Sequence, residues 1–272
     1  MQAFASQRRR EVVRGRVLAY PTLLFLLAAP VSAQSVETGF LDRTVTVAGQ
    51  SYRYQVYVPA EYPTKAGWPV ILFLHGAGER GTDGLLQTTV GLGPAIRREP
   101  RRFPAIVIFP QAPPDSQWVG APAEMALAAL RQTMREFHVE PNRVYLTGLS
   151  MGGHGAWYLA YRHPELFAAV APICGWVEDV SQFRGSVPVV PAESGAAVPA
   201  LARRLAKTPI WIFHGEMDAV VPVTGSREPA GALKAVSADV RYTEFLGLNH
   251  NSWDAVYASD EFTRWLFAQQ RR

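Results

Sequence analysis

The stretch Val144–Gly153 (VYLTGLSMGG) is the feature that most constrains how this chain folds. A G-x-S-x-G pentapeptide is weak evidence by itself, but here it follows a strand-like apolar run and precedes a helical segment. The flanking glycines, Gly148 and Gly152, leave room for a sharp, strained turn that projects the Ser150 hydroxyl above a sheet. The free amides of the following helix would face a developing negative charge. We therefore predict that Ser150 is a nucleophile.

Short, nearly continuous apolar runs recur along the chain and are typical of strands buried on both faces of a parallel sheet. These runs are Val70–Leu74, Ala105–Phe109, Val144–Leu146, Ala168–Ile173 and Ile210–Phe213, with a last strand at Val240–Phe245. Helical segments fall between or after them, at Ala123–His138, Gly152–Arg162, Glu228–Ala235 and Glu261–Gln269. Two further strands, Arg43–Ala48 and Tyr52–Val58, predict an N-terminal antiparallel hairpin. The pattern predicts an α/β fold with a mostly parallel central sheet and helices on both faces.

A serine hydroxyl needs a base to take its proton, and the order Ser, Asp, His along the chain is expected for this architecture. Asp218 follows the strand-like run IWIF, and His250 follows the run ending at Phe245. Both lie just past strand ends, at the edge of the sheet where Ser150 is expected. We predict that His250 is the general base and that Asp218 orients it.

Other residues could in principle take these roles. His214 is an alternative base, but its position within a strand favours a structural role. Glu216 and Asp254 are alternative acids, and Asp254 is more typical of a helix cap or a surface group.

An acyl-transfer site also needs two preorganised amides for the oxyanion. The amide of Met151, directly after the nucleophile, is the first candidate. The second comes from the glycine-rich loop 74–81, where we favour Ala77. We expect His75 to anchor this loop. Trp118 follows another strand end and either lines the substrate pocket or fills the core of its loop.

The net charge of +4 belongs to the N-terminal segment, which carries five arginines and one acidic residue in positions 1–33. The remaining residues hold 22 basic and 22 acidic side chains, so the composition does not favour nucleic-acid binding. The uncharged run Val17–Val31 and the small residues up to Ala33 are typical of a secretory signal peptide. The run is short for a membrane span and contains two prolines, so we expect no stable membrane insertion. These features predict a secreted or periplasmic protein with one catalytic domain over residues 34–272.

The single cysteine, Cys174, excludes an intrachain disulfide and a site built on several thiolates. We interpret it as a buried small hydrophobic residue. No phosphate loop and no cluster at metal-ligand spacing occurs, so we expect neither a cofactor nor a metal ion.

The segment 176–206 shows no strong helical or strand period, and we interpret it as a lid or substrate-shaping insertion at the edge that carries Ser150. Its valines and prolines, Val187–Pro191, would offer a stiff apolar wall to the substrate.

Five segments together resemble one known family: Phe73–Gly81, Pro110–Trp118, Arg143–Trp157, Ile212–Pro222 and Arg241–Tyr257. They are similar to secreted α/β-hydrolases of the predicted-peptidase group, which are related to polyhydroxybutyrate-depolymerase-like, feruloyl and acetyl-xylan esterases. The resemblance covers about Thr44–Gln270. It implies an α/β-hydrolase fold with Ser150, Asp218 and His250 as the triad.

Together these inferences predict an exported serine hydrolase that cleaves carboxylic esters, free or polymer-linked, through an acyl-enzyme intermediate. A serine peptidase with the same triad and an acyltransferase are alternatives. A catalytically inactive binding module is a further alternative, which the complete set of triad residue types disfavours.

The signal-peptide pattern generates a testable prediction. Export should remove residues 1–33, because small side chains precede the expected cleavage point. Mass spectrometry of the exported protein should find an N-terminus at, or within a few residues of, Gln34. Recovery of the full-length chain in the membrane fraction would contradict cleavage and favour an anchor.

Overall fold

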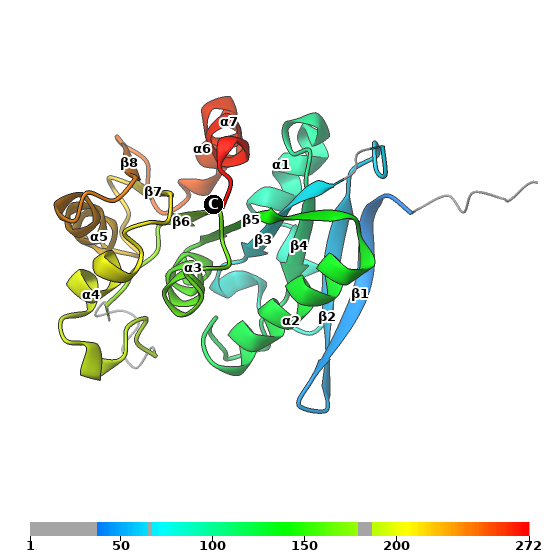
Figure 1. The fold of residues 1–272 in the computed structure, drawn as a ribbon, viewed down its shortest axis with the longest axis horizontal. Helices are drawn as coiled ribbons and strands as arrows, with labels where there is room; N and C mark the ends of the chain where they lie inside the picture. Colours follow the sequence, from blue (N-terminus) through cyan, green and yellow to red (C-terminus); the bar gives the residue numbers. More distant parts are fainter. Residues whose placement is uncertain (1–36, 65–66, 179–186, 272) are drawn as a thin grey trace, which may run out of the picture. The chain divides into compact units, whose positions relative to one another are not determined.

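The computed structural model describes residues 37–64, 67–178 and 187–271. The expected signal peptide, 1–33, lies outside the described residues. Within them, eight strands form one sheet in the order β1-β2-β4-β3-β5-β6-β7-β8 (Figure 1). The strands are β1 (Gly39–Val47), β2 (Gln50–Val58), β3 (Trp68–Leu74), β4 (Ile106–Pro110), β5 (Val139–Leu149), β6 (Ala169–Ile173), β7 (Ile210–Gly215) and β8 (Val240–Phe245).

The six strands from β3 to β8 run parallel, and the N-terminal hairpin joins them antiparallel through β2 and β4. Strands β3, β4, β6 and β7 are buried at every residue, which explains their continuous apolar sequences. The predicted fold class is therefore confirmed as an α/β-hydrolase fold with an N-terminal antiparallel hairpin.

Helices cover both faces of the sheet and create two hydrophobic cores (Figure 1). One core lies under α2 (Ala121–Glu136), α3 (Met151–Arg162), α4 (Ala197–Arg204) and α5 (Thr224–Ala235). The opposite core lies under α1 (Leu92–Arg98), α6 (Trp253–Tyr257) and α7 (Asp260–Ala268). Helices α1 and α6 were not predicted from the sequence, because both are short and lack a sustained amphipathic period.

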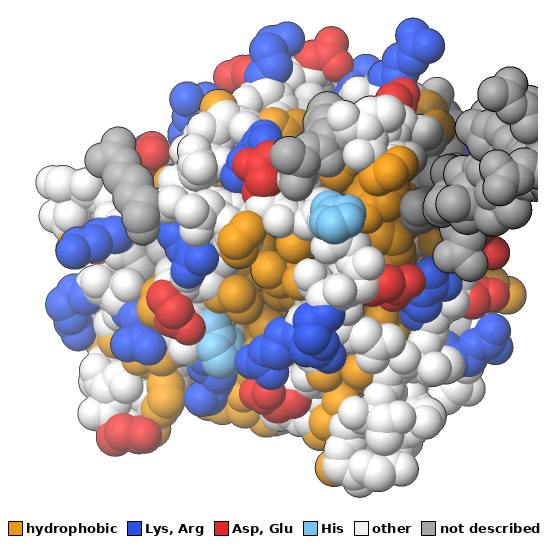
Figure 2. Space-filling model, turned by 45° about the vertical axis from the view of Figure 1, so that its right-hand side comes forward, with side chains coloured by type: hydrophobic (Ala, Val, Ile, Leu, Met, Phe, Trp, Pro, Cys, Tyr) orange, Lys and Arg blue, Asp and Glu red, His pale blue; other side chains and the backbone are white. Residues whose placement is uncertain are grey.

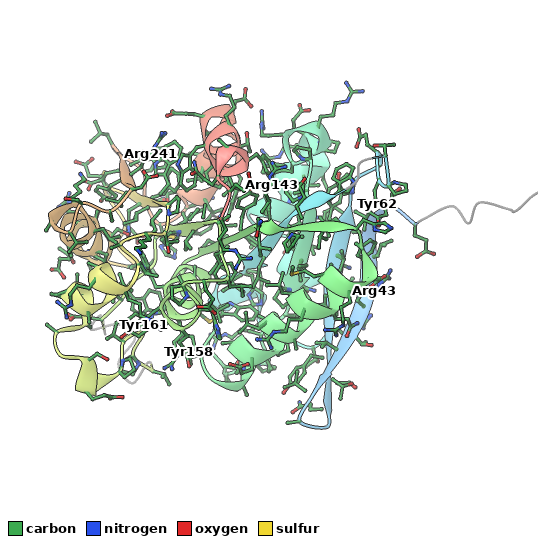
Figure 3. All side chains as sticks on the ribbon, in the orientation of Figure 1. Arg43, Tyr62, Arg143, Tyr158, Tyr161 and Arg241 are labelled. Atoms are coloured by element: carbon green, nitrogen blue, oxygen red, sulfur yellow. The ribbon has the colours of Figure 1, made fainter. Side chains whose placement is uncertain are left out.

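Polar contacts attach the hairpin and the segment after it to α2 and to the residues that follow α2, at one end of the sheet (Figure 3). Arg43 of β1 donates from Nε and Nη2 to the Glu136 carboxylate, with a shortest distance of 2.6 Å. The hydroxyl of Tyr62 accepts from the backbone amide of His138 at 3.0 Å. Because the Arg43–Glu136 pair is partly exposed, we assign it no more than about 1 kcal/mol of stability.

The segment 176–206 differs from the expectation of an irregular excursion. Residues 179–186 lie outside the described part, but positions 197–204 form α4, which packs on α5. Val189 and Val190 are buried, and only Val187 of the three valines is exposed. The predicted apolar wall is therefore wrong for Val189 and Val190, which contribute to the core.

Contacts with α3 hold this segment in place. The Tyr161 hydroxyl donates to Ser194 Oγ at 3.3 Å, and the Arg204 guanidinium lies 5.3 Å from the centre of the Tyr161 ring (Figure 3). Helix α4 was missed because it is short and contains Pro199.

Among the described residues, no helix combines the length and the apolar character needed to cross a membrane. On the face shown in Figure 2, basic and acidic side chains are interspersed and do not gather by sign. This agrees with the near balance of charges after residue 33.

The packing of α3 against the sheet generates a prediction about two helical glycines. A Cβ at Gly152 would overlap the Leu74 carbonyl oxygen, whereas a Cβ at the exposed Gly231 of α5 meets nothing within 4 Å. Gly152→Ala should therefore destabilise the protein by about 3 kcal/mol or more. Gly231→Ala should stabilise it by about 0.5–1 kcal/mol, since alanine is the better helix former. Urea unfolding of both variants measures the difference, and a shift in the same direction for both would contradict this packing argument.

Candidate active site

Ser150 occupies the sharp turn between β5 and α3. Its backbone lies in the strained left-handed half of dihedral space, with φ of 53° and ψ of −118°. The Ser150 amide donates to the carbonyl of Ile173 on the neighbouring strand at 2.9 Å, which holds the turn against the sheet. A Cβ at Gly148 would overlap the Gly152 carbonyl, so both glycines are required for this geometry.

The structure brings the three predicted site residues together, although 100 positions separate the serine from the histidine. His250 Nε2 lies 3.0 Å from Ser150 Oγ, and His250 Nδ1 lies 2.7 Å from Asp218 Oδ2. Because a carboxylate only accepts, Nδ1 carries the proton and Nε2 is left to accept from the serine hydroxyl. All three residues follow the carboxyl ends of parallel strands, namely β5, β7 and β8.

Asp218 is held as a carboxylate by three hydrogen bonds and by the nearby imidazole of His214. Its Oδ1 accepts from the amides of Val220 and Val221, each at 2.8 Å. Its Oδ2 accepts from His250 and lies 3.2 Å from Nε2 of His214. Burial raises the pKa of Asp218, but hydrogen bonds from His214, His250 and Val221 outweigh this and hold the pKa well below its usual range. Asp218 thus stays negatively charged although its side chain is fully buried.

The alternative residues from the sequence do not take these positions. His214 contacts Asp218 and has no hydrogen bond to Ser150 in the described structure. Glu216 accepts from the Gly247 amide, and Asp254 accepts from the Asn251 side chain. The geometry therefore favours Asp218 and His250 over these alternatives, while their catalytic roles stay predictions.

Met151 and Ala77 each begin a helical turn, so their amides lack an intrahelical acceptor. Met151 is the first residue of α3, and Ala77 is the first residue of the 3₁₀ turn Ala77–Glu79. Burial raises the pKa of the neighbouring Glu79 carboxyl group, and the backbone amides of Gly76 and Glu79 partly offset this rise. These features keep Met151 and Ala77 as the candidate oxyanion donors.

The Ala77 loop is fixed by buried hydrogen bonds. His75 accepts from the Ala112 amide through Nε2 at 3.0 Å and donates from Nδ1 to the Gly76 carbonyl at 2.6 Å. Burial lowers the pKa of His75 to about 4, so this side chain is neutral at pH 7. The expected anchoring role of His75 agrees with these contacts.

Trp118 does not line a substrate pocket. Its side chain is 0% exposed, and its Nε1 donates to the His75 carbonyl at 2.9 Å. The prediction of a substrate-binding Trp118 is therefore corrected: the indole fills the core beneath the Ala77 loop. The proline-rich sequence around it could not distinguish these two placements.

Trp253 is an aromatic residue beside the site that the sequence analysis did not single out. Its ring packs edge-to-face on the His250 ring, with centroids 5.4 Å apart, and it is partly exposed at the start of α6. The sequence feature that could have identified this contact is the position of Trp253 three residues after His250. Trp253 thus supports the imidazole from a partly exposed position.

Cys174, Asp218 and His250 offer ligand atoms within 4.8 Å of one another. The chemistry does not fit a metal centre, because burial raises the pKa of the Cys174 thiol and keeps it protonated. Asp218 and His250 are moreover engaged in the hydrogen bonds described above.

Fold and site geometry together define an α/β-hydrolase with a Ser-His-Asp arrangement. Comparison with known families then assigns the chain: residues 46–226 match the model of a family described as "Putative esterase", and the chain belongs to this family. A relative from Nocardia uniformis subsp. tsuyamanensis, named "Putative esterase NocK", is 27% identical over 195 residues. That match covers 69% of this chain and 52% of the relative, so this chain spans about half the relative's length.

Solved structures show the same architecture. The crystal structure of a thermostable esterase is 35% identical, with a TM-score of 0.72, and the match covers 85% of this chain and 63% of that chain. A ferulic acid esterase from Anaeromyces mucronatus, solved with ferulic acid, is 19% identical with a TM-score of 0.61. That match covers 87% of this chain and 92% of the esterase chain, and at this identity it supports the fold alone.

The lowered pKa of Asp218 generates a pH prediction. A carboxyl group with a depressed pKa in the folded state stabilises the protein above its unfolded pKa of about 3.9, and this contribution is lost as the pH falls. Asp218→Asn should therefore be less stable than the wild type at pH 7, and the difference should shrink as the pH falls below about 4. Urea unfolding between pH 7 and pH 3 measures this trend.

Ser150→Ala is the matched control, since it retains every hydrogen bond to the Asp218 carboxylate. Its stability relative to the wild type should not vary over the same pH range. An Asp218→Asn difference that stays constant down to pH 3 would contradict the assigned electrostatics.

Proposed function

We propose that this protein is a serine esterase that hydrolyses carboxylic esters through an acyl-enzyme intermediate. The observation that carries the proposal is the Ser150–His250–Asp218 chain of contacts, 3.0 Å and 2.7 Å long, on a strained turn after β5. Membership of the esterase family supports the same chemistry.

In the proposed first step, Ser150 Oγ forms a bond to the ester carbonyl carbon while its proton moves to His250 Nε2. The carbonyl oxygen becomes an oxyanion, which the amides of Met151 and Ala77 stabilise. The tetrahedral intermediate then collapses, the bond to the leaving alkoxy group breaks, and His250 returns the proton to that oxygen. An alcohol leaves, and the acyl group remains on Ser150.

In the second step, His250 takes a proton from water as the water oxygen attacks the acyl carbon. The bond to Ser150 Oγ breaks, His250 reprotonates the serine, and the carboxylic acid leaves. Throughout both steps the Asp218 carboxylate keeps the His250 tautomer and stabilises the imidazolium. No metal ion or cofactor takes part in this proposal.

The substrate surface around the site is partly apolar. His250 retains 20% of its side-chain exposure, so the triad faces an accessible region. Met217 and Val220 flank Asp218 and are 66% and 43% exposed. These apolar side chains support an ester with an apolar acyl or alcohol group, either as a small molecule or at the end of a polymer side chain.

We propose further that the catalytic domain acts outside the cytoplasm, as a secreted or periplasmic enzyme. The basic, apolar and small-residue order of positions 1–33 supports this localisation.

The proposed nucleophile generates a direct prediction. Ser150→Ala should lower ester turnover by about 10⁴–10⁶-fold while the protein stays folded, because the proposed mechanism cannot form the acyl-enzyme without the serine hydroxyl. The purified mature protein should be assayed with p-nitrophenyl esters, methyl ferulate, acetylated xylan and peptide anilides. A folded Ser150→Ala variant that keeps more than a tenth of the ester activity would refute the assignment.

The same panel separates the alternatives. A higher kcat/KM for peptide anilides than for esters would favour a peptidase. Transfer of the acyl group to an added alcohol in preference to water would favour an acyltransferase.

A further inference from the structure

A second histidine, His214, lies behind the catalytic acid. It occupies β7 and its side chain is completely buried. Its Nδ1 is 2.7 Å from Ser226 Oγ on α5, and its Nε2 is 3.0 Å from the carbonyl of Val221. The same Nε2 is 3.2 Å from Oδ2 of Asp218. Nothing in the two-step mechanism above uses this residue.

The partners of His214 determine where its proton lies. A carbonyl and a carboxylate can only accept, so Nε2 must carry a hydrogen. Nε2 is hydrogen-bonded to the Val221 carbonyl and lies 3.2 Å from the Asp218 carboxylate. Nδ1 is then free to accept from the Ser226 hydroxyl, which donates. His214 is thus oriented with its Nε2 hydrogen beside Asp218, and both ring nitrogens are satisfied.

Asp218 Oδ2 therefore has an imidazole on each side: it accepts a hydrogen bond from His250 at the site, and the Nε2 of His214 lies 3.2 Å away on the core side. The other oxygen, Oδ1, is held by the amides of Val220 and Val221. We propose that His214, held by Ser226, is a positioning residue that aims the Asp218 carboxylate at His250 and limits how strongly that carboxylate attracts the His250 proton. This inference rests on the proposed esterase function.

The expected electrostatic effect has a definite direction. A hydrogen bond to the charged form of a carboxylate lowers its affinity for a proton. If the His214 donor is removed, Asp218 stabilises the His250 imidazolium more strongly, and the pKa of His250 rises. Activity that needs neutral His250 would then be lost at a higher pH on the acid side.

Other ionisable groups near His214 are already paired. Glu244 lies opposite His214 on β8 and accepts hydrogen bonds from Arg227 and Tyr242. The Cys174 thiol lies beside Asp218, and burial raises its pKa. These groups keep the contacts described here in a His214 variant, so the comparison of His214→Leu with His214→Gln assigns a shift of the acid limb to the lost donor.

Two substitutions test the proposal. His214→Leu fills the site without a donor, whereas His214→Gln places an amide nitrogen near the position of Nε2. We expect kcat/KM for p-nitrophenyl acetate to fall by about 10–100-fold in His214→Leu, the range seen when a partner of a functional side chain is removed. The acid limb of its pH profile should move upward by about half a unit or more. His214→Gln should stay within several-fold of wild type and keep the wild-type acid limb.

Ser226→Ala provides an intermediate case. Without the Ser226 hydroxyl, Nδ1 loses its partner and the His214 ring is held less firmly against Asp218, although Nε2 keeps its hydrogen. The acid limb should therefore move in the same direction as in His214→Leu, by a smaller amount.

Titration of active sites with a serine-reactive phosphonate corrects each rate for the fraction of folded enzyme. The proposal is overturned if His214→Leu keeps the wild-type acid limb, or if His214→Gln is impaired as much as His214→Leu. It is also overturned if the loss of activity in His214→Leu disappears after that correction.

A second measurement separates this inference from the esterase proposal. NMR titration of the His250 ring reports its pKa without any substrate, so it remains informative even if the wild type hydrolyses no ester. A raised His250 pKa in His214→Leu, with a wild-type value in His214→Gln, would support the positioning role. An unchanged pKa in both variants would overturn it.

Discussion

The close approach of α3 to the sheet is the constraint on which the rest of the site depends. Gly152 packs its backbone against the Leu74 carbonyl, where no Cβ fits, and the Ser150 amide bonds to the strand that ends at Ile173. This contact directs the serine side chain outward and places the first amide of α3 behind it. The same contact places the end of β3, and hence the Ala77 loop, beside the serine. Strain at one residue is therefore maintained by packing distributed over three strands.

The site also depends on a buried negative charge, which the Asp218 carboxylate carries. Asp218 keeps its charge in a dry position because two backbone amides and two imidazoles surround it, and each contact compensates part of the lost hydration. The turn after β7 supplies the amides, β8 leads to His250, and β7 itself carries His214. His250, the proposed base, is thus oriented through several layers of side chains, which reach from the accessible site to the interior of the domain.

The parallel arrangement of β5, β7 and β8 explains how distant positions form one site. Carboxyl ends of parallel strands meet at one edge of a sheet, so loops after these strands converge irrespective of their separation along the chain. At the same edge, on the β3 side of β5, hydrogen bonds that involve His75 and Trp118 fix the Ala77 loop. The convergence of Ser150, Asp218 and His250 and the rigidity of the Ala77 loop therefore have a common structural origin in the strand order.

The sequence by itself determined the fold class, the strands near the site and the grouping of Ser150, Asp218 and His250. These follow from local signals: continuous apolar runs, glycines around a serine, and polar residues placed just after strands. Only the tertiary structure decided the placement of Trp118, Val189 and Val190 in the core, and the contact of His214 with Asp218. From the sequence alone, the side chain of a tryptophan or a histidine is equally compatible with a pocket, a core or a hydrogen-bond network. Which of these it occupies depends on neighbours that are remote along the chain and meet only when the sheet and its helices assemble.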